Sequence, residues 1–283
     1  MLQNSPQEWV QHRDTVGRVV FDIGSSHFDE SKAMGKLRKA LHNSYIDSKV
    51  NILSWEALSG PTSYLNNDAL LLRFIQNCIG KTKILIVLRN QYEFLYSLWA
   101  DRVRVGHSDS LKKFLRPHLK NWWWMKYKSV FKKMLYDKYT SVACKTFGEE
   151  RVKVMFLEDL KRSPNQFIEE IGNFVGAPLD GRSSSKRRSS LDPASIFVFR
   201  LFNSLAETPR EPGLMPSLLS TSTYWKMRRR LESDTFLSKI GAYVSKPDVR
   251  ALIPENVKEE IRKSNQRLSE LLSRDLGEIG YDM

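Results

Sequence analysis

The 283-residue chain contains only two cysteines, Cys78 and Cys144. Two thiols are too few for a disulfide scaffold or a four-cysteine zinc site, so we expect both to be reduced and partly buried. No apolar run approaches the roughly 20 residues of a membrane-spanning helix, and the polar first residues lack the apolar core of a signal peptide. No His, Cys and carboxylate cluster has metal-ligand spacing, so no metal is implied. These absences predict a soluble, cytoplasmic protein without a membrane span.

Acidic residues are also scarce relative to basic ones, with 32 Asp and Glu against 45 Lys and Arg and a net charge of +13. The excess is concentrated in residues 102–138, which hold 11 basic and two acidic residues, and in a second basic stretch over 182–230. Aromatic residues, among them Trp122, Trp123 and Trp124, interrupt the first stretch. Such a pattern suits a nucleic acid, an anionic membrane, an anionic nucleotide, an acidic glycan or simply a solvated helical face. Composition alone does not choose among these.

Short apolar runs alternate with segments of helical periodicity. The runs predict strands over residues 19–23, 50–55, 84–88 and 152–157, and the third is apolar on both faces, which is typical of a central parallel strand. The periodic segments predict helices over 31–43, 65–79, 92–105 and 123–147. This alternation predicts an α/β fold with a central parallel sheet and flanking helices. The chain is long enough for a core of this kind in a single domain of residues 1–283.

Helix start signals continue into the second half of the chain. Ser163, Pro164 and Gln166 predict an N-cap, a proline at the first helical position and a capping glutamine. Asp192 followed by Pro193 predicts a second start of this type, and an amphipathic helix is expected after Pro254. Residues 182–283 are therefore expected to be mostly helical.

The ends of the predicted strands are where a ligand is expected, because open parallel sheets bind ligands beyond their carboxyl edge. Arg89 follows the most apolar strand and directly precedes a predicted helix, and Ser97 lies eight residues further on. An arginine fork with a hydroxyl suits a phosphate group, which the amides of a helix start also favour. The alternative is that Arg89 pairs with a nearby carboxylate such as Glu93. Glu158 and Asp159, which follow the fourth strand, lie at the same kind of position.

Several segments resemble sulfotransferases that use 3′-phosphoadenosine 5′-phosphosulfate (PAPS). The first is KILIVLRNQYEFLYS, residues 83–97, which resembles their 3′-phosphate-binding segment. Next come FGEERVKV, LEDL and FVGAP, which begin at residues 147, 157 and 174, then KRRSSL from 186, then NQRLSELLSRDL from 265 with Gly280 and Tyr281. The resemblance extends from about residue 50 to the end of the chain and is to carbohydrate-type bacterial members.

The resemblance implies a function and roles for individual residues. It implies a sulfotransferase with a fold related to P-loop nucleotide kinases, which transfers a sulfuryl group from PAPS, its cosubstrate, to a hydroxyl of a carbohydrate-like acceptor. Arg89 and Ser97 would hold the 3′-phosphate of PAPS or of its product, 3′-phosphoadenosine 5′-phosphate (PAP). Three further residues would belong to a loop that closes over the nucleotide: Lys186, Arg187 and Arg188.

One part of the family pattern has no counterpart in residues 1–50. The family opens with a strand, a Lys-x-Gly-Thr-Thr loop and a helix that cradle the 5′-phosphosulfate, and this first unit is missing here, either through a shortened gene model or by real loss. Glu56 is the candidate catalytic base because it follows the second predicted strand; its alternative role is that of a carboxylate at a helix start. His27, after the first strand, is the second candidate. Two other functions stay open: a catalytically inactive nucleotide- or glycan-binding relative, and a basic nucleic-acid-binding protein.

Overall fold

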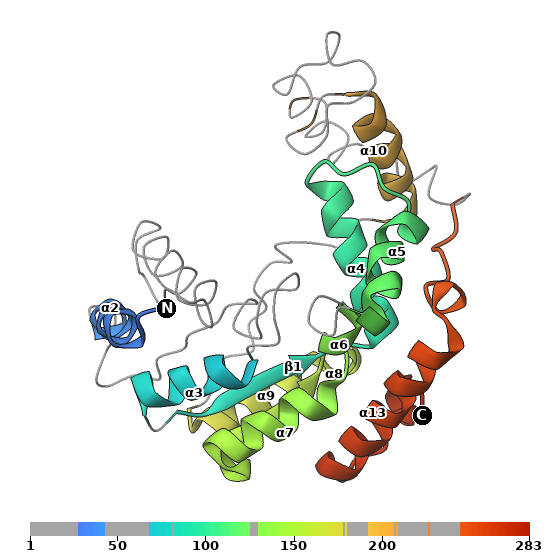
Figure 1. The fold of residues 1–283 in the computed structure, drawn as a ribbon. Coiled ribbons are helices and arrows are strands. Elements are labelled where there is room, and N and C mark those ends of the chain that lie inside the picture. Colours follow the sequence, from blue (N-terminus) through green and yellow to red (C-terminus); the bar gives the residue numbers. More distant parts are fainter. Residues whose placement is uncertain are drawn as a thin grey trace. The chain divides into compact units, whose positions relative to one another are not determined.

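The computed structural model describes residues 28–42, 68–80, 82–124, 130–177, 179, 192–206, 208, 226 and 244–283. The chain forms two compact units. Unit 1 comprises residues 1–88, 121–181 and 259–283, and unit 2 comprises residues 89–120 and 182–258. The elements of both units are labelled in Figure 1.

The described sheet of unit 1 consists of two parallel strands, β1 (Ile84–Leu88) and β2 (Val152–Phe156). Their register pairs Ile84 with Val152 and Leu88 with Phe156, so both strands end at the same edge. Together with the surrounding helices this confirms the α/β class and both predicted strands. The predicted strands over 19–23 and 50–55 lie outside the described residues.

One face of β1 is more exposed than its sequence predicts. Ile86 and Leu88 are buried, whereas the side chains of Leu85 and Val87 are 37% and 49% exposed. The apolar sequence predicted a strand buried on both faces; the structure buries only alternate residues. Period-two burial of this kind is what a sheet with a single covered face produces.

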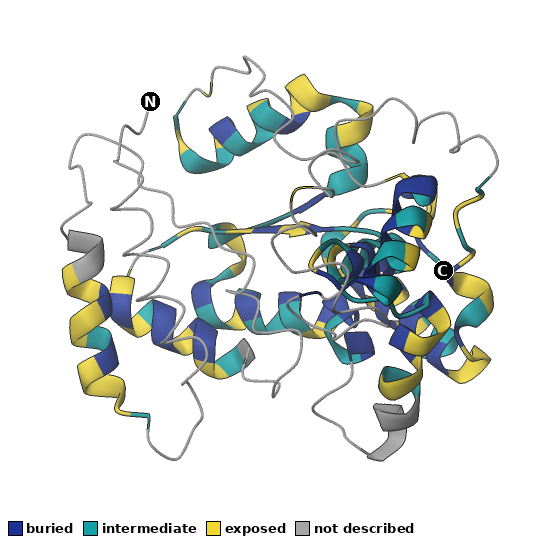
Figure 2. Ribbon diagram, turned by 90° about the horizontal axis from the view of Figure 1, so that it is seen from above, coloured by how far each residue is buried: buried dark blue, intermediate teal, exposed yellow. Residues whose placement is uncertain are grey.

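The helices of unit 1 are α2 (Glu30–His42), α3 (Asp68–Ile79), α6 (Val130–Lys133), α7 (Tyr136–Phe147), α8 (Leu157–Arg162) and α9 (Pro164–Val175). A single apolar cluster joins α2, α3 and α7 to the strands, and includes the fully buried Phe147 and Phe156. The longer helices, such as α2 and α3, carry buried residues on one side and exposed residues on the other, as Figure 2 shows. This amphipathic pattern is what their sequence periodicity predicts.

The last segment of the chain completes this core. Helix α13 (Glu255–Leu272) begins after Pro254, as predicted, and its Leu268 is fully buried. Beyond it, Leu276, Ile279 and Tyr281 belong to the same apolar cluster, and the Tyr281 ring contacts Phe156 edge-on at 5.5 Å. Core residues of unit 1 are thus drawn from parts of the chain more than 100 residues apart.

Two other features of unit 1 qualify the sequence-based helix predictions. Helix α9 begins at Pro164 after Ser163 and ends at Gly176, whose positive φ of 80° suits glycine, but the Ser163 side chain makes no capping hydrogen bond. The single helix predicted over 123–147 is wrong: α6 and α7 are separate and are interrupted at Met134 and Leu135. Both interrupting residues are buried, so the apolar periodicity continues through the turn and does not reveal it.

Unit 2 contains α4 (Gln91–Arg104), most of α5 (Leu111–Trp124) and α10 (Pro193–Leu205). Helix α10 starts at the predicted Asp192–Pro193 pair, where the Asp192 carboxylate accepts hydrogen bonds from the amide and hydroxyl of Ser195. Burial alone would raise the pKa of Asp192, but these hydrogen bonds outweigh it and lower the pKa. Helices α4 and α10 pack against each other in this unit.

The fully buried Asn203 of α10 closes the end of α4. Its amide donates to the carbonyl oxygens of Val103, at 2.8 Å, and His107, at 2.9 Å. We expect Asn203→Ala to lower the free energy of unfolding by about 2 kcal/mol, because a fully buried amide is removed and the carbonyl groups of Val103 and His107 each lose one hydrogen bond. Ser204→Ala is the matched control, since the Ser204 hydroxyl bonds only to Leu201 of its own helix at an exposed position. Urea unfolding of both variants measures the difference, and equal stability would contradict the role of Asn203.

Candidate functional site

Arg89 lies at the junction between β1 and α4. Its side chain is 21% exposed, and its guanidinium donates to the carboxylate of Glu93 at 3.3 Å. The carboxylate pairing that the sequence left open as an alternative therefore exists. A guanidinium has five N–H donors in a planar fork, more than one ion pair with a carboxylate uses.

Asn90 begins α4 and takes up part of its N-terminal hydrogen-bonding capacity. The side-chain oxygen of Asn90 accepts from the amides of Tyr92, at 3.0 Å, and Glu93, at 3.3 Å. This is the ordinary N-cap arrangement, and the Glu93 carboxylate adds a favourable charge in the first turn. The amides of Tyr92 and Glu93, which lie at the helix start predicted to favour a phosphate, are thus already hydrogen-bonded to Asn90. Arg89 thus stays the residue of this junction that the sequence predicts to bind a phosphate.

Arg89, Glu93 and Ser97 follow one another at intervals of four residues. Residues four apart on a helix are surface neighbours, so Ser97, which is half-buried, lies on the same stripe of α4 as Glu93. The Arg89–Glu93 ion pair shows that the stripe continues back to the residue before the N-cap. The two residues predicted to bind the 3′-phosphate are therefore brought to one side of this helix.

The structure adds Lys246, which the sequence analysis did not identify. Its ammonium forms an ion pair with Glu93 and lies 4.7 Å from the centroid of the Tyr96 ring. Glu93 thus contacts two cations, Arg89 and Lys246, which leaves the three-residue cluster with an excess of one positive charge. No pattern in the sequence marks Lys246, because it is a single basic residue in an irregular segment more than 150 residues from Glu93.

The other predicted site residues lie outside the described residues. These are the candidate bases Glu56 and His27 and the closing-loop residues Lys186, Arg187 and Arg188. The three adjacent tryptophans end α5, and their side chains are not among those described. The roles of these residues stay predictions.

The two carboxylates after β2 have structural contacts in unit 1. Arg274 forms a bidentate ion pair with Asp159 at 2.7 and 2.8 Å, and its guanidinium lies 4.9 Å from the Phe156 ring centroid. Glu158 accepts a hydrogen bond of 3.4 Å from the hydroxyl of Tyr281, whose pKa is raised by burial and by the Glu158 charge. These contacts attach the end of the chain to β2 and α8. They give the Glu-Asp pair a structural role.

The two cysteines are free, with Cys78 buried and Cys144 half-buried, as the sequence predicts. Burial raises the pKa of both thiols, so neither is a reactive thiolate near neutral pH. Within the described part of the chain, no group of three or more His, Cys, Asp or Glu residues could hold a metal ion. None of the helices in that part is both long and apolar enough to cross a membrane.

Comparisons with known proteins identify the class to which this chain is related. Residues 68–197 match the family model described as a sulfotransferase domain, a segment that includes β1, α4 and β2. The resemblance found in the sequence is thereby confirmed over these residues, which make up less than half of the chain. The chain is also similar to the crystal structure of a sulfotransferase from Alicyclobacillus acidocaldarius, at 17% identity and a TM-score of 0.44. That alignment covers 75% of this chain and 62% of the other one. No curated protein matches the chain.

Proposed function

We propose that this protein is a PAPS-dependent sulfotransferase that transfers a sulfuryl group to a hydroxyl of a carbohydrate-like acceptor. In the reaction, the acceptor oxygen forms a bond to sulfur while the bond from sulfur to the phosphate oxygen of PAPS breaks, which leaves PAP. The proton of the acceptor hydroxyl passes to a base. Glu56 is our first candidate for this base and His27 our second.

The stripe formed by Arg89, Glu93 and Ser97 is the observation that supports the proposal most directly. It lies inside the segment that matches the sulfotransferase domain. A guanidinium fork and a hydroxyl on one side of a helix can together contact the oxygens of one phosphate group. Lys246 offsets the charge of Glu93, so the carboxylate does not cancel the attraction of Arg89 for an anion.

The remaining roles in the proposal come from residues outside the described part. We assign closure over the nucleotide to Lys186, Arg187 and Arg188, whose three positive charges suit a nucleotide with several phosphate and sulfate charges. The 5′-phosphosulfate needs its own cationic or amide contacts. Residues 1–50 lack the Lys-x-Gly-Thr-Thr loop that supplies them in the family, which keeps a catalytically inactive nucleotide-binding relative as the alternative.

Two measurements on the purified 283-residue chain test the proposal. Incubation with PAPS labelled in its sulfate group and a panel of mono- and oligosaccharides should move label into the sugar. Calorimetric titration should give at least tenfold tighter binding of PAP than of 5′-AMP, because only PAP carries the 3′-phosphate that Arg89 and Ser97 contact in the proposal.

The combined results separate the alternatives. PAP binding without transfer to any acceptor supports the inactive relative, while equal affinity for PAP and 5′-AMP contradicts a 3′-phosphate site of any kind. Retention of DNA or RNA that falls steeply with salt, and that PAP fails to displace, supports a nucleic-acid-binding protein instead.

A further inference from the structure

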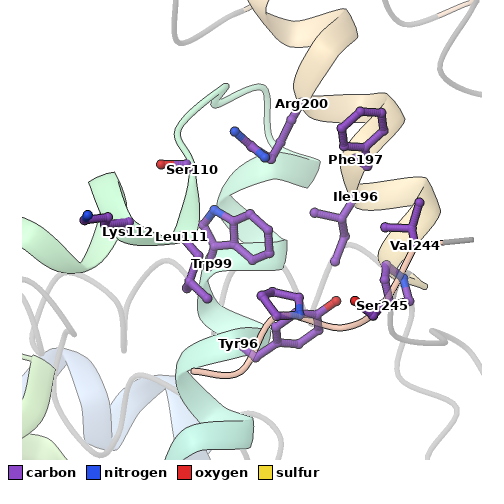
Figure 3. Close-up of a pocket in the computed structure, with 12 residues that line it drawn as sticks. Tyr96, Trp99, Ser110, Leu111, Lys112, Ile196, Phe197, Arg200, Val244 and Ser245 are labelled. Atoms are coloured by element: carbon purple, nitrogen blue, oxygen red, sulfur yellow. The ribbon is translucent and has the colours of Figure 1, made fainter. Parts of the chain in front are cut away.

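Unit 2 contains a pocket of about 300 Å³ that the proposed reaction does not use. Its walls come from α4, the start of α5, α10 and the segment before α13. Aromatic and aliphatic side chains form most of the surface, with Tyr96 and Trp99 facing Ile196 and Phe197 (Figure 3). A pocket of this size with predominantly apolar walls can enclose a one- or two-ring organic molecule.

The hydroxyl of Tyr96 is the polar group of this pocket that most clearly requires a ligand. Tyr96 is only 6% exposed, and its hydroxyl oxygen is buried without a hydrogen-bond partner in the described part of the chain. A buried hydroxyl that makes no hydrogen bond is destabilising. Burial, with smaller effects from Asp192 and Glu93, raises the pKa of Tyr96 to about 12. The hydroxyl therefore keeps its proton near neutral pH and is available as a donor.

Arg200 supplies the second polar feature. Its Nε donates to the carbonyl oxygens of Ser108, at 3.3 Å, and Asp109, at 3.1 Å, and its guanidinium lies 5.7 Å from the Trp99 ring centroid. These contacts use the Nε side of the guanidinium and fix its plane, which leaves the terminal amino groups as further donors. Figure 3 shows the side chain reaching from α10 toward Trp99, while Lys112 points away from the rings.

The polar groups that line the pocket can all donate hydrogen bonds. Besides Tyr96 and Arg200 they are the hydroxyls of Ser110 and Ser245; the ammonium of Lys112 points away from the rings, and no carboxylate is among the described lining residues. The acidic groups around the pocket all have partners: Asp109 is paired with Lys113 at 2.7 Å, Glu93 with Arg89 and Lys246, and Asp192 is hydrogen-bonded to Ser195. A ligand that satisfies this surface must offer acceptors, and a negative charge suits the desolvated guanidinium.

We propose that this pocket binds a small organic anion with a flat apolar body, such as an aromatic carboxylate. The rings of Trp99, Tyr96 and Phe197 would contact the body of the ligand, and the Tyr96 hydroxyl and Arg200 its acidic group. The site adjoins the proposed nucleotide site at Tyr96, whose ring lies 4.7 Å from the Lys246 ammonium that pairs with Glu93; its other contacts lie on another side of α4. Trp99 is two residues from Ser97, about 200° around the helix, so the two side chains project from opposite sides of α4. The proposal goes beyond sulfuryl transfer and does not depend on it.

The test uses 2-naphthoate as the probe and its neutral counterpart, 2-naphthamide, as the ligand control. We expect calorimetry on the full chain to show 2-naphthoate binding at least tenfold tighter than the amide, because only the acid carries the charge that Arg200 attracts. Tyr96→Phe should weaken naphthoate binding by about tenfold. It should leave the thermal midpoint unchanged or raise it, since the removed hydroxyl has no partner among the described residues.

A second variant and a control separate binding from folding. Phe197 is 52% exposed, so Phe197→Ala should have little effect on stability. This variant should bind 2-naphthoate and 2-naphthamide more weakly by a similar factor. Tyr139→Phe in unit 1 controls for loss of a hydroxyl elsewhere and should change neither affinity. Absence of naphthoate binding, equal binding of the two probes, or unchanged affinity in Tyr96→Phe would overturn the proposal. Complete displacement of naphthoate by saturating PAP would show that both ligands occupy one site and would also overturn the proposal.

Discussion

Arg89→Ala should weaken PAP binding by roughly 100-fold, while the affinity for 5′-AMP changes less than threefold. Charge-assisted hydrogen bonds from a guanidinium to a phosphate are among the strongest polar contacts in proteins, and a forked contact forms two of them. 5′-AMP lacks the phosphate that the proposal assigns to Arg89. Calorimetric titration of both nucleotides into the wild-type chain and the variant measures the two ratios.

The control for this prediction is Arg116→Ala. Arg116 is an exposed basic residue of α5 in the same unit, so its loss changes the net charge by the same amount without removing a contact of the Arg89 cluster. It should alter PAP affinity less than threefold. An equal loss of PAP and 5′-AMP affinity in Arg89→Ala would assign Arg89 to the general charge of the site or to the ion pair with Glu93, and not to the 3′-phosphate.

Asp137→Ala should lower the free energy of unfolding of unit 1 by about 2–3 kcal/mol. The Asp137 carboxylate is 10% exposed and accepts hydrogen bonds from the Ser264 hydroxyl, at 2.5 Å, and from Arg267 Nε, at 2.6 Å. Without this carboxylate, the fully buried hydroxyl of Ser264 loses its hydrogen-bond acceptor and the guanidinium of Arg267 loses its counterion. Because Arg267 is half exposed, water can solvate part of its charge. This places the expected loss below that of a fully buried ion pair.

Chemical denaturation with a probe in unit 1 measures this effect. Asp137→Asn, which keeps an acceptor for Ser264, should lose about half as much stability as the alanine variant. Glu150→Ala is the surface control, because Glu150 is 74% exposed and pairs only with its chain neighbour Arg151, so it should change stability by less than about 0.5 kcal/mol. Equal stability of Asp137→Ala and Glu150→Ala would show that the contacts of Asp137 with Ser264 and Arg267 contribute nothing to the free energy of unfolding.

The elements with strong local signals could be predicted from the sequence. Both described strands were predicted, and so was the α10 start at Asp192, where a carboxylate caps the helix and proline fixes the first φ angle. The helix expected over 123–147 failed because Met134 and Leu135 keep the apolar pattern while the backbone turns. Both residues are buried by tertiary packing, so this turn contains no polar residue that would reveal it in the sequence.

The candidate site also has a part that the sequence predicts and a part that depends on tertiary packing. Arg89 and Ser97 could be named as candidates from the sequence because they lie in a short continuous motif around a strand end, and their four-residue spacing from Glu93 is a property of one helix. Lys246 was missed because its contact with Glu93 depends on how a distant irregular segment packs in unit 2. The pocket could not be predicted for a related reason. In the sequence its aromatic residues look like ordinary core residues, and only the structure shows that the Tyr96 hydroxyl has no partner among the described residues.

The division of the chain into discontinuous units has a consequence for its synthesis on the ribosome. Unit 1 contains both residue 1 and residue 283 and is interrupted twice by segments of unit 2. Its core includes Leu276 and Tyr281, and Arg274 bonds to Asp159 across 115 residues. The nascent chain therefore cannot complete this core until residue 281 has been translated and has left the exit tunnel. Until then Phe156 and its apolar neighbours lack part of their cover, which makes the emerging polypeptide a natural client for chaperones that hold exposed apolar segments.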